Sequence, residues 1–286
     1  MSTLEGFEGV YIVEPISKYL RYLFKVSRIH ALEKTPYQEV VLAEIEGFGR
    51  SLILDKFIQS AEKDEYMYHE LLVHPAMCLH PHPERVLILG GGEGATLREV
   101  LKHNTVREAI MVDIDPVVVE FSKRYLEHMH RNSFNDPRAK VIIMDGKDYV
   151  KQTPSSYFDV VIMDLTDPYA SEIAKPLYSP EAFREIRRVL RDDGVVVTQA
   201  GSSYFYPDEY KWVLGSVKSS FKYISEYWFW VPSFGLNVNF VVASNVYRLE
   251  DYVNTIDERL RERGVTTRLV SGRFIDGLLK IGVLYP

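Results

Sequence analysis

Val86-Leu87-Ile88-Leu89-Gly90-Gly91-Gly92-Glu93-Gly94 is the most informative stretch of this 286-residue sequence. Its run of branched apolar residues predicts a buried parallel strand, and the glycines after it let the chain turn sharply and bring its backbone close to a ligand. Residues 95–103 have helical spacing. The stretch therefore predicts a strand, a glycine loop and a helix, the opening unit of a nucleotide-binding α/β sheet.

The glycine spacing leaves the class of ligand open. Gly90, Gly92 and Ala95 also fit the pattern of dinucleotide-binding dehydrogenases, so they do not separate these from adenosyl-binding transferases, or from a structural turn without a ligand. Glu93 does discriminate, because a pyrophosphate needs bare amide groups and would be repelled by a carboxylate. We therefore expect a ligand with a nucleoside and a positive charge but no pyrophosphate.

Composition narrows the class of protein. With 46% hydrophobic residues, the chain is expected to form one large domain and a smaller one. It has neither an apolar window that would span a bilayer nor the pattern of a secretion signal, which predicts a soluble, cytoplasmic protein. Its single cysteine, Cys78, excludes an intramolecular disulfide and thiolate zinc clusters. The net charge of −6 argues against nucleic acid as a partner and suits cationic small molecules.

Residues 1–61 are expected to form an N-terminal antiparallel β domain, and residues 62–286 a larger domain. Strands are predicted at residues 22–32, 37–45, 51–54 and 57–59, with a hairpin turn at 47–49. From Ala61 the pattern becomes helical, with Glu62, Asp64 and Glu65 in the first turn, until residues 80–83 (His-Pro-His-Pro) end the helix.

Four histidines in this region raise the question of a metal site: His69, His74, His80 and His82. Their spacing fits no common zinc pattern. We therefore expect surface or linker positions for them and no bound metal.

The larger domain is predicted to be of the α/β class, with a Rossmann-like seven-stranded sheet of the adenosyl-methyltransferase type. Besides the strand before the glycine loop, strands are expected at residues 109–112, 141–144, 159–163 and 194–199, with a closing antiparallel pair at 223–231 and 239–243. Asp115-Pro116 predicts the start of a helix that runs to about His130.

Carboxylates follow these strands at their C-terminal ends, where open α/β sheets bind ligands. Asp113 lies twenty residues after Glu93, where an acidic side chain typically binds ribose hydroxyls, and Asp145-Gly146 suits a base amino group. Asp164 and Asp167 follow the next strand. Five carboxylates around one crevice repel one another unless positive charge fills it, so the set predicts a receptor for cations.

The sequence resembles the polyamine aminopropyltransferases, the family of spermidine, spermine and thermospermine synthases, over about residues 36–245. The resemblance is carried by Tyr37-Gln38, Leu54-Asp55 with Ile58-Gln59-Ser60, Asp64-Glu65 with Tyr68-His69-Glu70, Gly90 to Gly94, Asp113-Ile114-Asp115, Asp145-Gly146 and Asp164-Leu165-Thr166-Asp167-Pro168. Within the family it is most similar to thermospermine synthases, in Glu93 instead of the commoner aspartate, His69 instead of glutamine, Thr198-Gln199-Ala200-Gly201 and Val231-Pro232-Ser233-Phe234.

The resemblance implies transfer of an aminopropyl group from decarboxylated S-adenosylmethionine to a polyamine, with release of methylthioadenosine and without a cofactor or metal. This donor carries a sulfonium and an ammonium but no carboxylate, whereas a methyltransferase must accept the methionine carboxylate, which Glu93 would repel. Donor contacts are implied for Gln38, Gln59, Glu93, Asp113, Asp145 and Gly146, and acceptor contacts for Tyr68, His69, Glu93, Asp164 and Asp167.

Asp164 is the expected catalytic base, because a protonated amine has no lone pair and must lose its proton in the site before it attacks carbon. The family's usual Asp-Pro-x-Gly-Pro is here Asp167-Pro168-Tyr169-Ala170-Ser171, and Phe234 replaces a common tyrosine. These departures favour spermidine as acceptor and a tetraamine as product, with putrescine or agmatine as alternatives. A methyltransferase, a dehydrogenase and a non-catalytic binding protein remain as other classes, and a homodimer or homotetramer is expected by analogy and from exposed strand edges.

Overall fold

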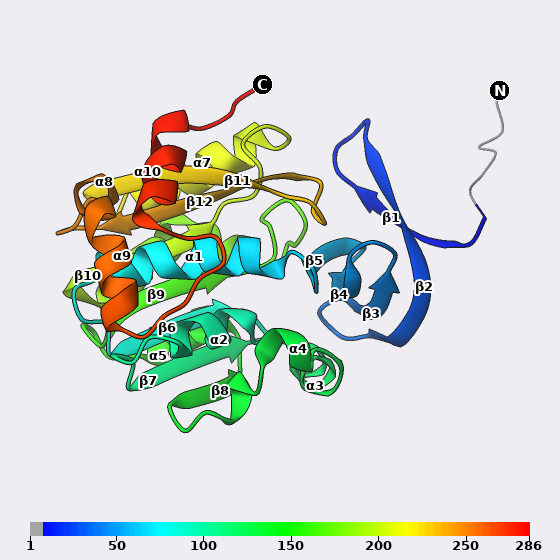
Figure 1. Cartoon of the computed structure of the whole chain (residues 1–286), viewed down its shortest axis with the longest axis horizontal. Helices are drawn as coiled ribbons and strands as arrows, with labels where there is room; N and C mark the ends of the chain where they lie inside the picture. Colours follow the sequence, from blue (N-terminus) through cyan, green and yellow to red (C-terminus); the bar gives the residue numbers. More distant parts are fainter. Residues whose placement is uncertain (1–7) are drawn as a thin grey trace.

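The computed structural model describes residues 8–286 and contains two β-sheets with helices packed on the larger one (Figure 1). The strands are β1 (Val10–Pro15), β2 (Arg21–Lys34), β3 (Glu39–Ile45), β4 (Gly49–Leu54), β5 (Phe57–Ala61), β6 (Arg85–Gly90), β7 (Glu108–Asp113), β8 (Ala139–Ile143), β9 (Phe158–Asp164), β10 (Leu190–Gln199), β11 (Tyr223–Val231) and β12 (Leu236–Ser244). The helices are α1 (Glu65–Leu79), α2 (Ala95–Leu101), α3 (Pro116–Tyr125), α4 (Glu127–His130), α5 (Gly146–Gln152), α6 (Pro180–Val189), α7 (Pro207–Lys218), α8 (Leu249–Tyr252), α9 (Ile256–Glu262) and α10 (Gly272–Ile281).

The N-terminal sheet has the order β1-β2-β3-β4-β5, with every neighbouring pair antiparallel. The predicted antiparallel β-structure is confirmed, although the edge strand β1 was not predicted. Residues 1–7 of the predicted domain lie outside the described part of the chain. Gly47 and Gly49 both have positive φ in the turn between β3 and β4, as a hairpin there requires.

The larger sheet confirms the predicted fold class. Its order is β11-β12-β10-β9-β6-β7-β8, in which β8, β7, β6, β9 and β10 run parallel and β12 is antiparallel to both of its neighbours, β10 and β11. The chain reverses its direction across the sheet between β6 and β9. In this fold, that reversal opens a crevice beyond the C-terminal ends of the strands.

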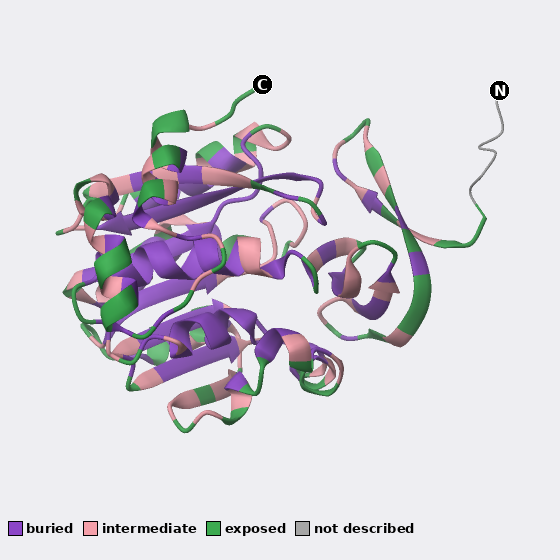
Figure 2. Ribbon diagram, viewed as in Figure 1, coloured by how far each residue is buried: buried purple, intermediate pink, exposed green. Residues whose placement is uncertain are grey.

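Helix α1 is buried on all sides rather than on one face, as Figure 2 shows. Asp64 is its N-cap, so only Glu65 of the predicted acidic residues lies in the first turn. Because the helix packs against both the sheet and α2 and α9, its polar residues are enclosed as well.

The predicted surface or linker positions are therefore wrong for His69 and His74, which lie within α1, whereas His80 does lie in the linker after that helix. His69, His74 and His80 are buried, and only His82 is exposed. Local spacing could not reveal this, because a second layer of helices covers the outer side of α1.

The helix predicted to run from residue 116 to His130 is divided into α3 and α4. The break comes at Leu126, whose side chain is fully buried. Leu126 packs with Leu42 and Leu52 of the N-terminal sheet, so the break places an apolar anchor between the two domains.

The segment beyond Leu249, for which the sequence makes no prediction, forms helices α8 to α10. Helix α10 packs on β11 and α9 on α1, so this segment covers the outer face of the larger sheet (Figure 1). Among the described residues, none of the helices combines the length and the apolar character needed to cross a membrane.

Candidate active site

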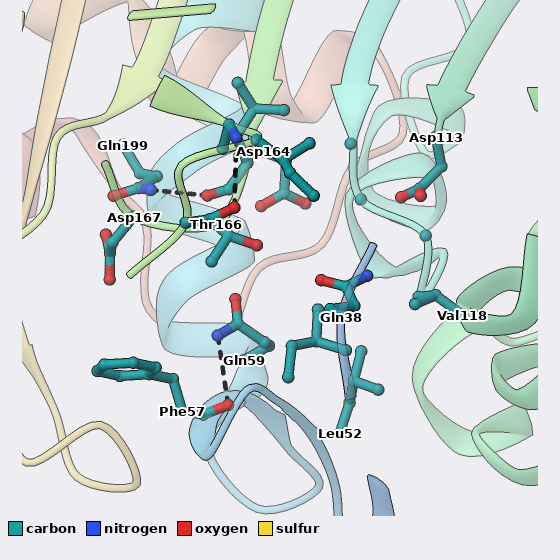
Figure 3. Close-up of a pocket in the computed structure, with 18 of the residues that line it drawn as sticks. Gln38, Leu52, Phe57, Gln59, Asp113, Val118, Asp164, Thr166, Asp167 and Gln199 are labelled. Atoms are coloured by element: carbon teal, nitrogen blue, oxygen red, sulfur yellow. Dashed lines mark hydrogen bonds between the residues drawn. The ribbon is translucent and has the colours of Figure 1, made fainter. Parts of the chain in front are cut away.

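A pocket lies between the two sheets, beyond the C-terminal ends of β6, β7 and β9 (Figure 3). It encloses about 1240 Å³, part of which is open to solvent. Nine of the ten residues that the sequence predicted for the site line it: Gln38, Gln59, Tyr68, Glu93, Asp113, Asp145, Gly146, Asp164 and Asp167. The tenth, His69, lies behind Glu93. The five carboxylates expected around one crevice are thus brought together.

The glycine loop brings the chain against β9. Gly90, Gly91 and Gly94 have φ values of 81°, 71° and 79°, and the Gly91 N–H donates to the Asp164 carbonyl at 2.9 Å. A Cβ atom on Gly90 would lie 2.1 Å from that carbonyl oxygen, and one on Gly92 would lie 2.6 Å from an Asp113 carboxylate oxygen. Only glycine therefore allows this approach, as the sequence predicted.

Asp164 ends β9, and both of its carboxylate oxygens are held. Tyr68 on α1 donates its hydroxyl to Oδ1 at 2.8 Å, and Thr96 on α2 donates to Oδ2 at 2.6 Å. Burial, with the nearby charge of Glu93, raises the pKa of Asp164 to about 6. Thr96 was not predicted, although its hydroxyl two residues after the last glycine of the loop is a signal that the sequence contains.

Asp113 and Gln38 stand on the side of the pocket where β7 ends (Figure 3). Burial raises the pKa of Asp113 to about 7, and its Oδ1 accepts the Asp115 N–H at 2.9 Å. Gln38 comes from the N-terminal domain and donates to Asp115 at 3.1 Å. Asp115 in turn caps α3 by accepting the Val117 N–H. This wall of the pocket is therefore formed by residues of both domains, and the first turn of α3 holds Asp115 in place.

His69 connects Glu93 to a second buried glutamate. Its Nε2 is 2.7 Å from Glu93 Oε1 and its Nδ1 is 2.8 Å from Glu65 Oε2. One ligand atom each from His69, Glu93 and Asp164 lie within 4.8 Å of one another, which is the spacing of a metal site. However, a histidine nitrogen that donates to a carboxylate has no lone pair for a metal, so this geometry fits an ion pair better.

The opposite end of the pocket is lined by Asp167 and by Glu14 of β1. Tyr169 donates its hydroxyl to Asp167 Oδ2 at 2.6 Å, and its ring stacks on Tyr206 with 3.5 Å between the centroids. Burial raises the pKa of Asp167 to about 6 and that of Glu14 to about 8. Glu14 was missed, because a single acid in an otherwise apolar strand carries no recognisable pattern.

Gln199 at the end of β10 belongs to the stretch Thr198-Gln199-Ala200-Gly201, which carries part of the family resemblance, but no role was predicted for it. Its Nε2 donates to the Leu165 carbonyl and to the Tyr178 hydroxyl, each at 2.7 Å. These bonds hold the segment between Asp164 and Asp167 against the sheet. Asp164 and Asp167 therefore reach the pocket from one short segment, which these hydrogen bonds hold in place.

The arrangement suits a cationic ligand with an adenosine-like part. Acids are distributed along the whole pocket, from Asp145 and Asp113 through Glu93 and Asp164 to Asp167. A phosphate would meet Glu93 in the loop, whereas ammonium and sulfonium groups would find counter-charges throughout.

Comparisons with known proteins agree with this geometry. Residues 65–251 match the family described as spermine/spermidine synthase domain, and residues 10–62 match the spermidine synthase tetramerisation domain. The polyamine aminopropyltransferase of Pyrobaculum calidifontis is 55% identical over 269 residues, which cover 92% of each chain. Polyamine aminopropyltransferase 1 of Hyperthermus butylicus is 54% identical over 253 residues, 87% of each chain.

Two solved structures are similar over almost the whole length. A spermidine synthase in complex with the transition-state analogue AdoDATO superposes with a TM-score of 0.90 at 28% identity, covering 98% of this chain and 94% of that one. The spermidine synthase of Thermotoga maritima gives a TM-score of 0.87 at 28% identity, covering 97% and 96%. With its acid-lined pocket, its two matched domains and these relatives, the chain belongs to the spermine/spermidine synthase family and is a polyamine aminopropyltransferase.

Proposed function

We propose that the enzyme transfers the aminopropyl group of decarboxylated S-adenosylmethionine to spermidine, forming thermospermine and methylthioadenosine. The observation that carries the donor assignment is Glu93, a carboxylate in the glycine loop beside Asp164. It would bind the donor's ammonium and repel the carboxylate of S-adenosylmethionine itself. In this proposal Gln38, Gln59, Asp113, Asp145 and Gly146 bind the remainder of the donor.

Asp164 is the proposed base. A carboxylate with a pKa of about 6 is ionised at neutral pH and remains basic enough to accept a proton from an ammonium that is close to attack. The amine nitrogen, freed of that proton, forms a bond to the aminopropyl carbon adjacent to sulfur. The carbon–sulfur bond breaks, and its electron pair stays on sulfur, which leaves as a neutral thioether. Alignment of nitrogen, carbon and sulfur supplies much of the rate.

Tyr68 and Asp167 are the proposed acceptor contacts, and Glu14 extends the acidic wall beyond them. A chain that carries several ammonium groups would place one near Asp164 and another near Asp167. With a pKa of about 8, Glu14 is largely neutral in the free pocket at pH 7, and an ammonium bound beside it would favour its ionised form. Phe234 lies 5.7 Å from Tyr68, ring to ring, and offers no hydroxyl to a far amine. This apolar wall favours a longer acceptor over a short diamine.

Spermidine synthesis is the second candidate. The similarity to spermidine synthases over 97–98% of the chain favours it, with putrescine or agmatine as the acceptor. A cytoplasmic location is part of the proposal as well, since the buried thiol of Cys78 and the polyamine substrates suit a reducing interior.

A product analysis tests the proposal. Purified enzyme is supplied with decarboxylated S-adenosylmethionine and, separately, with putrescine, agmatine, cadaverine, spermidine or norspermidine, and thermospermine is resolved from spermine. A clear rate advantage for spermidine, with thermospermine as product, is expected. A faster reaction with a diamine or agmatine would replace it with triamine synthesis, and no methylthioadenosine with any acceptor would contradict aminopropyl transfer. S-adenosylmethionine serves as the control donor and should not react.

A further inference from the structure

His69 occupies an unusual place for a residue of a polyamine site. It is 1% exposed and lies on α1, one layer behind the pocket wall. Each ring nitrogen faces a carboxylate oxygen: Nε2 that of Glu93 at 2.7 Å, and Nδ1 that of Glu65 at 2.8 Å. The ring is therefore enclosed between two acids and has no contact with the pocket itself.

Three contacts determine how many protons the ring carries, because Nδ1 also lies 2.7 Å from the Glu65 backbone carbonyl oxygen, which can only accept a hydrogen bond. An ionised carboxylate only accepts hydrogen bonds, so both nitrogens must be protonated if both acids are ionised. Glu65 is ionised, because Arg98 on α2 donates to both of its oxygens, at 2.9 Å and 3.1 Å. Glu93 lines the pocket and would face the cations of the proposed function, which favour its ionised form. The hydrogen bonds thus describe an imidazolium between two carboxylates.

Other charged and titratable groups around the ring agree with this state. The Tyr68 ring on α1 lies perpendicular to the His69 ring, with 5.1 Å between the ring centroids. Asp164 on β9 has a carboxylate oxygen within 4.8 Å of a His69 nitrogen. Burial alone lowers the pKa of His69, but the bonds and charges of Glu65 and Glu93 outweigh it and raise the pKa to about 10. The positive charge therefore persists across the physiological range.

We propose that His69 is a positioning residue that acts as a permanent imidazolium: it aims the Glu93 carboxylate at the donor's ammonium and offsets the negative charge that Glu93 and Asp164 bring together. This rests on the proposed function only in that the donor carries the ammonium. His69 is not among the residues that line the pocket, so this role differs from the acceptor contact that the resemblance implies. The positive charge of His69 also lowers the pKa of Asp164, so it favours the ionised base.

Two amide variants separate the hydrogen bond from the charge. In His69→Gln the amide reaches the place of Nε2 and still donates to Glu93, without a charge. In His69→Asn the amide reaches only the place of Nδ1 beside Glu65, and Glu93 loses its donor. Methylthioadenosine release is measured against donor and acceptor concentration from pH 5 to 9, with exposed His82→Gln as the matched control.

His69→Asn should raise the KM for the donor about tenfold, the loss expected for one charge-assisted hydrogen bond, and leave the acceptor KM unchanged. His69→Gln should recover most of the donor KM above pH 8, while the acid limb of its kcat profile moves about one pH unit upward because Asp164 loses its counter-charge. A raised acceptor KM with an unchanged donor KM would overturn the proposal, as would an unmoved acid limb in His69→Gln.

Neutron diffraction of the wild-type enzyme measures the protonation of His69 directly, so the result does not depend on whether the variants fold. Deuterium on both Nδ1 and Nε2 of His69 at pH 7.5 is expected, and deuterium on one nitrogen only would overturn the imidazolium. Turnover of the wild-type enzyme in the kinetic assay tests the proposed function, independently of the protonation of His69. Absence of methylthioadenosine there would contradict the proposed function, while the protonation of His69 would still be read from the crystal.

Discussion

At the scale of single residues, the site depends on carboxylates whose surroundings differ. Asp164 has both oxygens occupied by hydroxyl donors, so its orientation is set before substrate arrives. Glu93 is held by the His69 imidazole, and Asp167 by the Tyr169 hydroxyl. Each of these acids is therefore held in place by side chains of the protein and also lines the pocket, which is the arrangement that a chain of cations requires.

Replacing the proposed base tests its role directly. Asp164→Asn keeps the size of the side chain but removes the proton acceptor, so kcat should fall about 10²–10⁴-fold. The dissociation constant of the donor, measured by calorimetry, should change less than threefold, because Asp164 acts on the acceptor nitrogen. Asp192→Asn, whose side chain is 99% exposed, is the control and should behave as wild type. Turnover within tenfold of wild type in Asp164→Asn would remove Asp164 from the chemistry.

The pH dependence of activity follows from the same carboxylates. Burial raises the pKa values of Asp164 and Asp167 to about 6, so both acids are ionised above that pH and become neutral as the pH falls through it. A neutral acid neither accepts the amine proton nor attracts an ammonium. The value of kcat/KM, which reports the free enzyme, should therefore decline below pH 6. A profile that stays flat down to pH 4.5, in an enzyme that remains folded by circular dichroism, would contradict these assignments.

At the scale of elements, the glycine loop and the end of β9 form one unit. Gly90 pairs with Asp164 in the β6–β9 register, and the Gly91 N–H bonds to the Asp164 carbonyl. The base is thus positioned through the backbone as well as through its side chain. Any widening of this contact would move Asp164 away from Tyr68 and Thr96.

Gly90→Ala measures that contact. The added Cβ would lie 2.1 Å from the Asp164 carbonyl oxygen, at a φ of +81°. The free energy of unfolding of the variant should therefore be lower by about 2 kcal/mol or more. Gly215→Ala in α7 is the matched control: nothing lies within 4 Å of its added Cβ, and alanine should stabilise the helix by about 0.5–1 kcal/mol. Urea unfolding monitored by fluorescence compares the two, and equal midpoints would disprove the tight approach.

At the scale of the whole molecule, the pocket exists only because two domains meet. The N-terminal domain contributes Glu14, Gln38 and Gln59, and the larger domain supplies the glycine loop and the acids around it. Packing around Leu126 joins the domains beside the site. The N-terminal sheet also leaves Ile29 and Leu32 of β2 about half exposed, at 50% and 59%, in the region that matches a tetramerisation domain.

Apolar residues exposed on that sheet predict a subunit interface. The double variant Ile29→Glu with Leu32→Glu would bring charge into such an interface, so light scattering coupled to size exclusion should show smaller particles than for wild type. Ile281→Glu on α10 is the control, because Ile281 is 68% exposed but lies on the larger domain. An unchanged mass for the double variant would direct the search for the interface away from this face of β2.

What the amino-acid sequence determined by itself is the sheet, its strand ends and the acids that follow them. Alternating patterns and glycine signals are local, and the C-terminal ends of parallel strands necessarily share one edge, so Glu93, Asp113, Asp145, Asp164 and Asp167 could be grouped without coordinates.

Tertiary packing alone decided what surrounds those acids. Whether His69 faces the pocket or Glu65 depends on α2 and on the second helix layer, which lie far from it in sequence. Glu14 and Thr96 reach the pocket because β1 and α2 are folded against it, and no local pattern encodes that. Burial, and with it the protonation of each acid and of His69, is a property of all the neighbours together and is therefore absent from any single stretch of the chain.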